Sequence, residues 1–377
     1  MIWGPNAAGK TSLLEAIVLL AWGHSHRTAT DAELIRWGAD VARVEADLRS
    51  ESGSTERLEL ALVRSGSTAA AGGSGRKQIR VNGVPRRATA LSGTLRTVVF
   101  APEEMLLIAG GPALRRATID QLAAARTPGY AATLATYGRA LAQRNRLLRA
   151  IREEDAERDE LRYWDQPLVE AGGDVVAGRR QLLAALADPL ARAHAEIAPE
   201  ESAARLGLRY ETNAPPLPGE SAREALARRL AETAEKEVWN GATLVGPHRD
   251  DVVFELAGRD LAGFASRGQQ RTAILALKLA ELELLTDLGE RPPLLLLDDV
   301  FSELDPERRA HLVRRIGALP QAFVTTTALG DLDPALLAIA TTWEVRPAAA
   351  GAVLVGPTLP ARKPGEVGAR SAAGDPG

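Results

Sequence analysis

The sequence predicts an α/β fold of the P-loop type, whose two halves are separated by a helical arm. Three observations support this prediction. Residues 4–11 match the pattern G-x-x-x-x-G-K-[ST] and are followed by an apolar helical pattern. Residues 294–297 are four leucines that end in two aspartates, as expected of a buried strand. From about 112 to 240 glycine becomes rare, and apolar residues recur at helical spacing.

The bulk properties restrict the class of protein. A chain of 377 residues is long enough for two domains or for one domain with an arm. The net charge of −3 gives no overall attraction for a polyanion, so any DNA-binding surface must be a local patch. The absence of cysteine excludes disulfides and thiolate metal sites. No long apolar run or signal peptide is found in the sequence, so we expect a cytoplasmic protein without a membrane partner.

The glycine-containing loop near the start is the first element of the predicted site. Its two glycines let successive backbone N–H groups point into one concavity that suits phosphate oxygens, and the following helix directs its positive end there. Lys10 can reach the β- and γ-phosphates, and the Thr11 hydroxyl can hold Mg²⁺. The predicted nucleotide-binding residues are Gly4, Pro5, Asn6, Ala7, Ala8, Gly9, Lys10, Thr11 and Ser12. Only three residues precede this loop, so its strand is expected to be a stub.

Short strands are predicted next. Residues 41–64 alternate as two strands, and residues 79–84 form a hairpin that turns on Asn82-Gly83. The Gly/Ser/Ala-rich stretch at 65–75 is expected to be flexible, and residues 98–100 form a short buried strand. Basic residues cluster around the hairpin, where they form either a solvated edge or a weak DNA contact: Arg76, Lys77, Arg80, Arg86 and Arg87.

The composition divides the chain into four parts. Residues 1–111 form the first part of the nucleotide-binding head, 112–240 the helical arm and 241–346 the second part of the head. Residues 347–377 form a mostly disordered tail with a last strand near 353–355. The arm is predicted to be a compact antiparallel set of helices, each at most about 30 residues or about 45 Å long.

Two further motifs complete the predicted site. Asp298, at the end of the leucine strand, would organise Mg²⁺ beside Thr11, and Asp299 would orient or deprotonate the attacking water. Ser266 is a good N-cap for the amphipathic helix that runs to Leu285. Gly268 leaves the amide end of that helix open to an anion.

Together these motifs resemble the ABC-type ATPase head, and within that class the RecF family of DNA repair proteins. The resemblance runs from residue 1 to about 346. It is carried by residues 25–28 (SHRT), 33–36 (ELIR), 100–103 (FAPE), 164–165 (WD), 246–251 (GPHRDD), 264–281, 297–305 (LDDVFSELD) and 325–327 (TTT). The Gly-Pro-His-Arg-Asp-Asp and Ser-x-Gly-Gln-Gln-Arg-Thr stretches are specific to this family.

The resemblance implies a function. RecF-like heads bind ATP, pair face to face and grip double-stranded or gapped DNA, and slow hydrolysis then releases it. RecO and RecR partners help such proteins to place RecA. On this basis Lys10 and Asp299 are catalytic, and Thr11 and Asp298 hold Mg²⁺. The resemblance also implies that Ser266, Arg267, Gly268 and Gln269 touch the γ-phosphate bound by the other subunit, and that Ser302 and Asp305 lie at the dimer contact.

The sequence also departs from the family pattern. Ala7 stands where the family usually has a glycine, and Arg267 stands where a glutamine is common. The strands that normally precede the loop, about 30 residues by comparison with the family, are expected to be missing. The resemblance implies a weak DNA-dependent ATPase. The alternatives are the ATPase subunit of a membrane transporter, a tether protein of the SMC or zinc-hook type, and a truncated ATP-gated clamp with negligible turnover.

Overall fold

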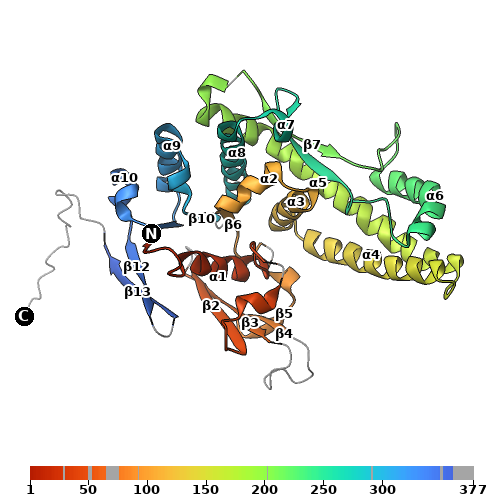
Figure 1. The fold of residues 1–377 in the computed structure, drawn as a ribbon, viewed down its shortest axis with the longest axis horizontal. Coiled ribbons are helices and arrows are strands. Elements are labelled where there is room, and N and C mark those ends of the chain that lie inside the picture. Colours follow the sequence, from red (N-terminus) through yellow and green to blue (C-terminus); the bar gives the residue numbers. More distant parts are fainter. Residues whose placement is uncertain are drawn as a thin grey trace, which may run out of the picture.

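The computed structural model contains a head and a long arm, which Figure 1 shows side by side. It describes residues 1–28, 30–49, 53–64, 76–91, 93–201, 203–289, 292–348 and 351–359, apart from the side chains of Arg76, Ser302, Glu303 and Asp331. The loop expected to be flexible at 65–75 and the tail from 360 onward lie outside these residues.

A six-stranded sheet forms the centre of the head. Its strands, in spatial order, are β13 (Gly351–Thr358), β12 (Thr342–Ala348), β1 (Ile2–Trp3), β11 (Ala322–Thr326), β10 (Leu294–Asp298) and β6 (Thr97–Phe100). All neighbours pair in parallel except β12 and β13, which pair antiparallel. The strand expected near 353–355 is thus β13, and the α/β fold that the sequence predicted is confirmed.

Successive leucines of strand β10 point to opposite faces of the sheet, and both faces are buried. Leu295 and Leu297 pack into the core formed with helix α8 (Arg267–Thr286), whereas Leu296 packs with Leu14 and Val18 of helix α1 (Lys10–Trp22). The two helices therefore enclose the sheet from opposite sides and hold its strand ends in fixed positions.

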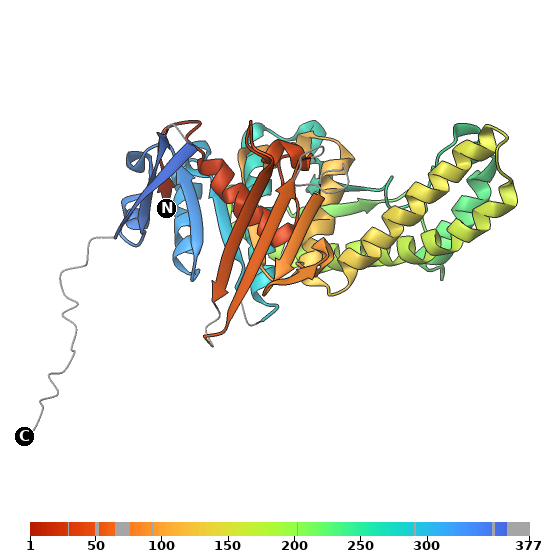
Figure 2. The ribbon, with the colours of Figure 1, turned by 90° about the horizontal axis from the view of Figure 1, so that it is seen from below.

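A second, antiparallel sheet covers the far end of α1. It consists of β2 (Val41–Arg49), β3 (Thr55–Val63), β4 (Arg76–Val81) and β5 (Val84–Arg86). Leucines of β3 and Ile79 pack against Leu19 and Leu20 of α1. Alternate residues face solvent, as period-two alternation requires. Figure 2 shows this sheet from below, with the arm extending away from it.

The arm consists mainly of four helices: α3 (Pro112–Arg126), α4 (Tyr130–Arg152), α5 (Arg162–Ile197) and α6 (Ala222–Asn240). The expected maximum of about 30 residues was wrong for α5, which has 36 residues with Pro167 and Pro189 inside it and spans about 54 Å. Strand β7 (Leu206–Glu211) was also missed. It pairs with β8 (Asp251–Leu256) and so joins the expected arm region to the second part of the head.

Short elements connect these units. They are strand β9 (Arg259–Asp260), helices α2 (Leu106–Ala109), α7 (Leu261–Phe264), α9 (Pro306–Gly317) and α10 (Pro334–Leu337), and the 3₁₀ turns η1 (Asp31–Leu34), η2 (Ala88–Ala90), η3 (Pro102–Met105), η4 (Arg158–Leu161), η5 (Pro199–Glu201), η6 (Val300–Glu303) and η7 (Leu329–Asp331).

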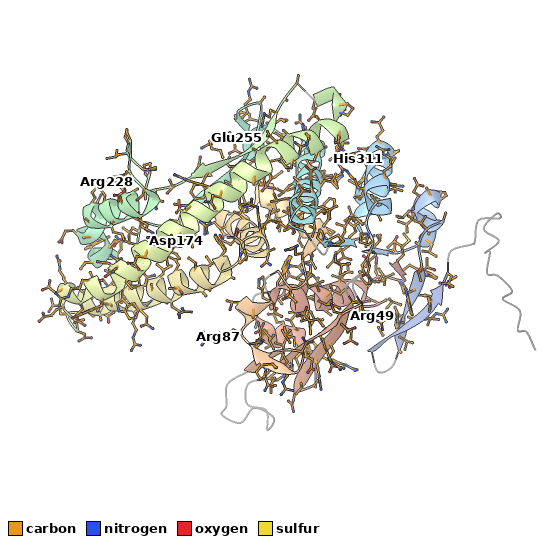
Figure 3. The ribbon with its side chains drawn as sticks, turned by 180° about the vertical axis from the view of Figure 1, so that it is seen from behind. Arg49, Arg87, Asp174, Arg228, Glu255 and His311 are labelled. Carbon is orange, nitrogen blue, oxygen red and sulfur yellow. The ribbon has the colours of Figure 1, made fainter. Side chains whose placement is uncertain are left out.

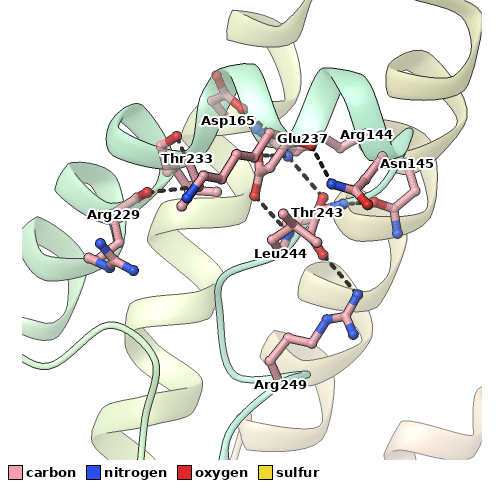
Figure 4. A network of polar contacts seen from close by, with 12 residues as sticks. Arg144, Asn145, Asp165, Arg229, Thr233, Glu237, Thr243, Leu244 and Arg249 are labelled. Atoms are coloured by element: carbon pink, nitrogen blue, oxygen red, sulfur yellow. Dashed lines mark hydrogen bonds and ion pairs between the residues drawn. The ribbon is translucent and has the colours of Figure 1, made fainter. Parts of the chain in front are cut away.

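A buried arginine ties the arm helices together (Figure 4). Arg144 of α4 is 2% exposed and forms ion pairs with Asp165 of α5 at 2.6 Å and Glu237 of α6 at 2.7 Å. Its guanidinium also donates to the Thr243 hydroxyl at 2.9 Å. Because every partner lies on a different element, this one side chain fixes α4, α5 and α6 against the segment that returns to the head.

The 246–251 stretch lies in a second polar network. Arg179 of α5 forms a bidentate pair with Asp120 of α3, at 2.7 and 2.8 Å, and donates to the Pro247 carbonyl at 2.7 Å. Tyr137 lies 2.6 Å from His248 Nδ1. Burial lowers the pKa of His248 to about 4, so the ring is neutral at pH 7. In this structure the stretch therefore joins the arm to the head.

Candidate nucleotide site

The glycine loop begins where β1 ends, at the carboxyl edge of the central sheet. Gly4 has φ +151°, and an added Cβ would lie 2.4 Å from the Val345 carbonyl oxygen of β12. Gly9 has φ +101° and is the N-cap of α1. A side chain at Gly4 would therefore displace the loop, which explains its glycine. Ala7 has φ +61°, a left-handed conformation that costs an alanine about 1–2 kcal/mol.

Lys10 points back over this loop. Its ammonium donates to the carbonyls of Gly4 at 2.9 Å and Pro5 at 3.0 Å, and the residue is only 7% exposed. An ammonium has three N–H donors, so one remains for a phosphate oxygen. Thr11 is the second residue of α1 and is partly buried, while Pro5, Asn6 and Ala7 are exposed on the loop.

The aspartate pair ends β10 at the same edge of the sheet. Strand register aligns Ile2 with Thr325, and Thr325 with Asp298, across three parallel strands. The structure therefore brings the start of the glycine loop and Asp298 to one sheet edge, as the sequence predicted. Asp298 is 7% exposed.

A threonine on β11, the strand between β1 and β10, orients the aspartates. The Thr325 hydroxyl donates to the Asp298 carboxylate at 2.5 Å and accepts the backbone N–H of Asp299 at 3.0 Å. Sequence reasoning noted Thr325 only within a family stretch and missed this role. The local sequence carries no signal for it, because the contact depends on the strand order that places β11 beside β10.

The helix that carries the third motif begins as predicted. The Ser266 hydroxyl accepts the backbone N–H of Gln269 at 3.2 Å, and the Gln269 side chain accepts the Ser266 N–H at 2.9 Å. This capping box starts α8. Ser266, Arg267 and Gly268 are exposed, so a second molecule can approach this helix end.

The two residues expected at the dimer contact have different outcomes. Asp305 is the N-cap of α9, where its carboxylate accepts the Arg308 N–H at 3.0 Å and pairs with the Arg308 guanidinium. These contacts hold the pKa of Asp305 below its usual value. The side chain of Ser302 lies outside the described part of the chain.

The basic cluster near the hairpin is only partly available to a ligand. Lys77 donates to the Gly23 carbonyl at 2.9 Å and pairs with Asp31 at 2.9 Å, so its charge serves local structure. Arg80, Arg86 and Arg87 are exposed on β4, β5 and the residue after β5. The Arg76 side chain is not described.

The SHRT stretch, residues 25–28, lines a separate cavity of about 540 Å³ at the other end of α1. Lys278 lies in its wall, buried between Glu104 at 2.5 Å and Glu281 at 3.3 Å. Burial raises the pKa of Glu281 to about 7. Among the residues that the structure describes, no three or more acidic or histidine side chains come together in a way that could hold a metal ion. The helices of this described part also include none with the length and apolar character needed to cross a membrane.

Comparisons with known proteins agree with this architecture. Residues 1–340 match the family model described as "RecF/RecN/SMC N terminal domain". Curated relatives are the DNA replication and repair proteins RecF of Chloroflexus aggregans, 41% identical over 92% of this chain and 91% of that protein, and of Bacillus subtilis, 38% identical over 88% of each.

Solved structures extend the comparison. The recombination mediator protein RecF with ATPrS superposes with a TM-score of 0.80 at 31% identity, covering 92% of this chain and 89% of that one. RecF with ATP gives 0.79 at 32% identity, covering 91% and 88%. An Smc head bound to a ScpA domain gives 0.50 at 14% identity, a likeness of fold alone.

Proposed function

The chain belongs to the RecF family of DNA replication and repair proteins, and we propose that it is an ATP-dependent clamp of recombinational repair. In this proposal two copies pair around ATP, hold double-stranded or gapped DNA, and release it after slow hydrolysis. The observation that carries the proposal is the register that aligns the glycine loop with Asp298, with Thr325 between them. One related RecF structure is of RecF with ATP and another of RecF with ATPrS.

The residues of the loop would hold the triphosphate. Backbone N–H groups of residues 6–11 and the N-terminus of α1 suit the phosphate oxygens, whereas Pro5 has no N–H to donate. Lys10, already fixed over the loop, contributes a positive charge near the β- and γ-phosphates without a large rearrangement. Phosphoryl transfer depends mainly on such charge stabilisation, so these groups are expected to bind ATP as well as to aid its hydrolysis.

Mg²⁺ fits the donor set at this edge. The ion prefers oxygen ligands, keeps several waters, and is commonly held by one or two carboxylates together with the substrate phosphates. Thr11 and Asp298 would supply a hydroxyl and a carboxylate, and the Thr325 hydroxyl already orients that carboxylate. When bound, the ion would neutralise charge on the phosphates. Asp299 is the residue that we propose to orient the attacking water.

The exposed end of α8 supports pairing. A capped helix N-terminus attracts an anion, and Ser266 and Gly268 leave this one open to a second subunit. We propose that it approaches the γ-phosphate bound by the other copy, so that the monomer hydrolyses ATP poorly. RecR and RecO are the proposed protein partners, in the cytoplasm.

Size-exclusion chromatography with light scattering tests the pairing. The expected result is a dimer with Mg²⁺ and ATP, and a monomer with ADP or without nucleotide. Lys10→Ala should remain monomeric and lose ATP-dependent retention of duplex DNA. A wild-type chain that stays monomeric with ATP contradicts the proposal.

Asp299→Asn tests the hydrolytic step. Asn tolerates the left-handed backbone that Asp299 adopts, with φ 52°, so the change removes charge without straining the chain. We expect hydrolysis to fall by at least tenfold, in the range of a lost acid–base group, and DNA retention to last longer. Phosphate release and dissociation of labelled duplex measure the two effects. Unchanged rates for both would exclude the role given to Asp299, and negligible turnover of the wild type would favour a clamp gated by ATP binding alone.

A further inference from the structure

The outer face of α4 carries positive charge that no acid of the helix balances. The helix contains five arginines and no aspartate or glutamate over 23 residues. Arg144 is buried in the network described above, and Arg152 turns toward the Asn240 carbonyl and Glu153. The other three, Arg139, Arg146 and Arg149, are exposed.

These three arginines lie on one side of the helix. At 100° per residue, Arg139 and Arg146 are about 20° apart and Arg149 about 60° further. The buried side chains Tyr137 and Leu148 occupy the opposite face. Arg139 and Arg146 are separated by about 10 Å along the axis. Their charges therefore form a line along the helix, with the neutral residues Thr136 and Gln143 beside them.

The lack of acidic partners distinguishes this line from most other arm arginines. Among the residues that the structure describes, no ion pair is formed by Arg139, Arg146 or Arg149, and Arg139 donates only to the Thr136 hydroxyl. In contrast, exposed arginines elsewhere on the arm pair with acids: Arg192 with Glu283, Arg205 with Asp188, and Arg223 with Asp174.

The position of α4 adds a second observation. Figure 1 shows it along the edge of the arm away from α7 and β7, on the side of the molecule that carries the β2–β5 sheet. Figure 3 shows Arg87 at the margin of that sheet nearest the arm. Arg80, Arg86 and Arg87 are exposed there. Two basic surfaces on separate units thus lie on one side of the molecule.

We propose that the outer face of α4, through Arg139, Arg146 and Arg149, binds the phosphate backbone of duplex DNA. This inference rests on the proposed function and adds a location to it. Planar guanidinium groups make bidentate contacts with phosphates, and a regular row of phosphates matches a row of unpaired arginines. Such contacts position the protein without reading sequence. The surface ends at the arm tip, where residues 153–160 are largely acidic and repel DNA.

A triple variant with a matched control tests the inference. Arg139→Gln, Arg146→Gln and Arg149→Gln are combined, because glutamine has nearly the helix propensity of arginine. The control combines Arg192→Gln, Arg205→Gln and Arg223→Gln, which removes the same charge from paired arginines. Fluorescence anisotropy with a labelled duplex of about 30 base pairs is measured with Mg²⁺ and ATP at several salt concentrations. Nucleotide affinity, expected to be unchanged, shows that both variants are folded.

The expected result is a weaker salt dependence in the α4 variant alone. Each lost phosphate contact lowers the slope of log K against log salt by about 0.9, so the slope should fall by about 2.7 for each copy whose α4 contacts the duplex, with similar weakening for unrelated sequences. A control variant that loses as much, or an α4 variant that binds DNA like the wild type, overturns the inference. Should the α4 variant keep its DNA affinity but lose an acidic protein partner, the surface binds protein and the inference is also wrong. A wild type that binds no duplex refutes the proposed function itself.

Discussion

At the scale of single residues, the proposed nucleotide site contains a hydroxyl that contacts both of its acids. The Thr325 hydroxyl contacts both members of the aspartate pair: it donates to the side chain of Asp298 and accepts the backbone N–H of Asp299. It is fully buried, at 0% exposed, in the strand between β1 and β10. Its position follows from strand order, which the local sequence around it does not reveal.

Thr325→Val is expected to weaken the site without removing any proposed ligand. Valine has nearly the same shape but cannot hold the Asp298 carboxylate, and loss of an orienting partner typically costs 10–100-fold in metal affinity or activity. Thr325→Ser keeps the hydroxyl and should stay within a few-fold of the wild type. Titration of ATP hydrolysis with Mg²⁺ measures both variants, and equal Mg²⁺ dependence of the valine and serine variants would refute the role of the hydroxyl.

The partners of single charged residues could not be predicted from the sequence. Lys77 belongs to the cluster predicted to form either a solvated edge or a weak DNA contact, and its side chain binds the Gly23 carbonyl and Asp31, which come from an earlier part of the chain. The Asp305 carboxylate caps α9, which the sequence did not predict, and its expected place at a dimer contact stays a prediction. A local pattern gives the type of side chain, whereas the long-range partner that occupies it appears only in the folded chain.

At the scale of elements, periodicity predicted most strands and helices correctly. The leucine strand, the hairpin at Asn82-Gly83 and the Ser266-capped helix are all confirmed. Strand β7 was missed and helix α5 is longer than expected, each for a physical reason. β7 lies in a stretch whose composition resembles that of the arm helices, and it is stabilised by pairing with β8, from Leu206 with Leu256 to Glu211 with Asp251. α5 continues through two prolines because packing of its buried face outweighs their cost.

The capped end of α8 gives an element-scale prediction. Aspartate is as good an N-cap as serine, so Ser266→Asp should change the free energy of unfolding by less than about 0.5 kcal/mol, whereas Ser266→Ala should cost about 1 kcal/mol. The added negative charge would repel a phosphate, so Ser266→Asp should abolish ATP-dependent dimerisation despite a stable fold. Chemical denaturation and light scattering measure the two properties, and a Ser266→Asp dimer of normal affinity would show that the helix end does not meet ATP.

At the scale of the whole molecule, buried polar groups join the arm to the head. Arg179, Tyr137 and His248 belong to different elements that meet near the 246–251 stretch. Burial raises the pKa of Tyr137 and lowers that of His248, and the nearby cations Arg249, Arg116 and Arg179 further disfavour a charged ring. Stability of the connection should therefore depend on pH.

Acidification should weaken the fold in a defined range. His248 has a pKa of about 4 in the folded chain against 6.5 when unfolded, so the unfolded chain binds the extra proton first. The stabilisation is complete above pH 6.5 and is lost as the pH falls toward 4, by up to about 3 kcal/mol. The buried acid Asp250, whose pKa is raised, partly opposes this loss. Denaturation of His248→Asn should show a shallower decline than the wild type, and equal declines would contradict the assignment.

The glycine loop packs against a strand that lies far from it in the sequence. Gly4 rests on the Val345 carbonyl, and β1 is held between β11 and β12, so segments separated by more than 300 positions must meet before the loop has its shape. During synthesis on the ribosome, residue 4 emerges long before residue 345. Incomplete nascent chains are therefore expected to be unable to bind ATP until translation is nearly finished. They would then not compete with complete chains for nucleotide or DNA.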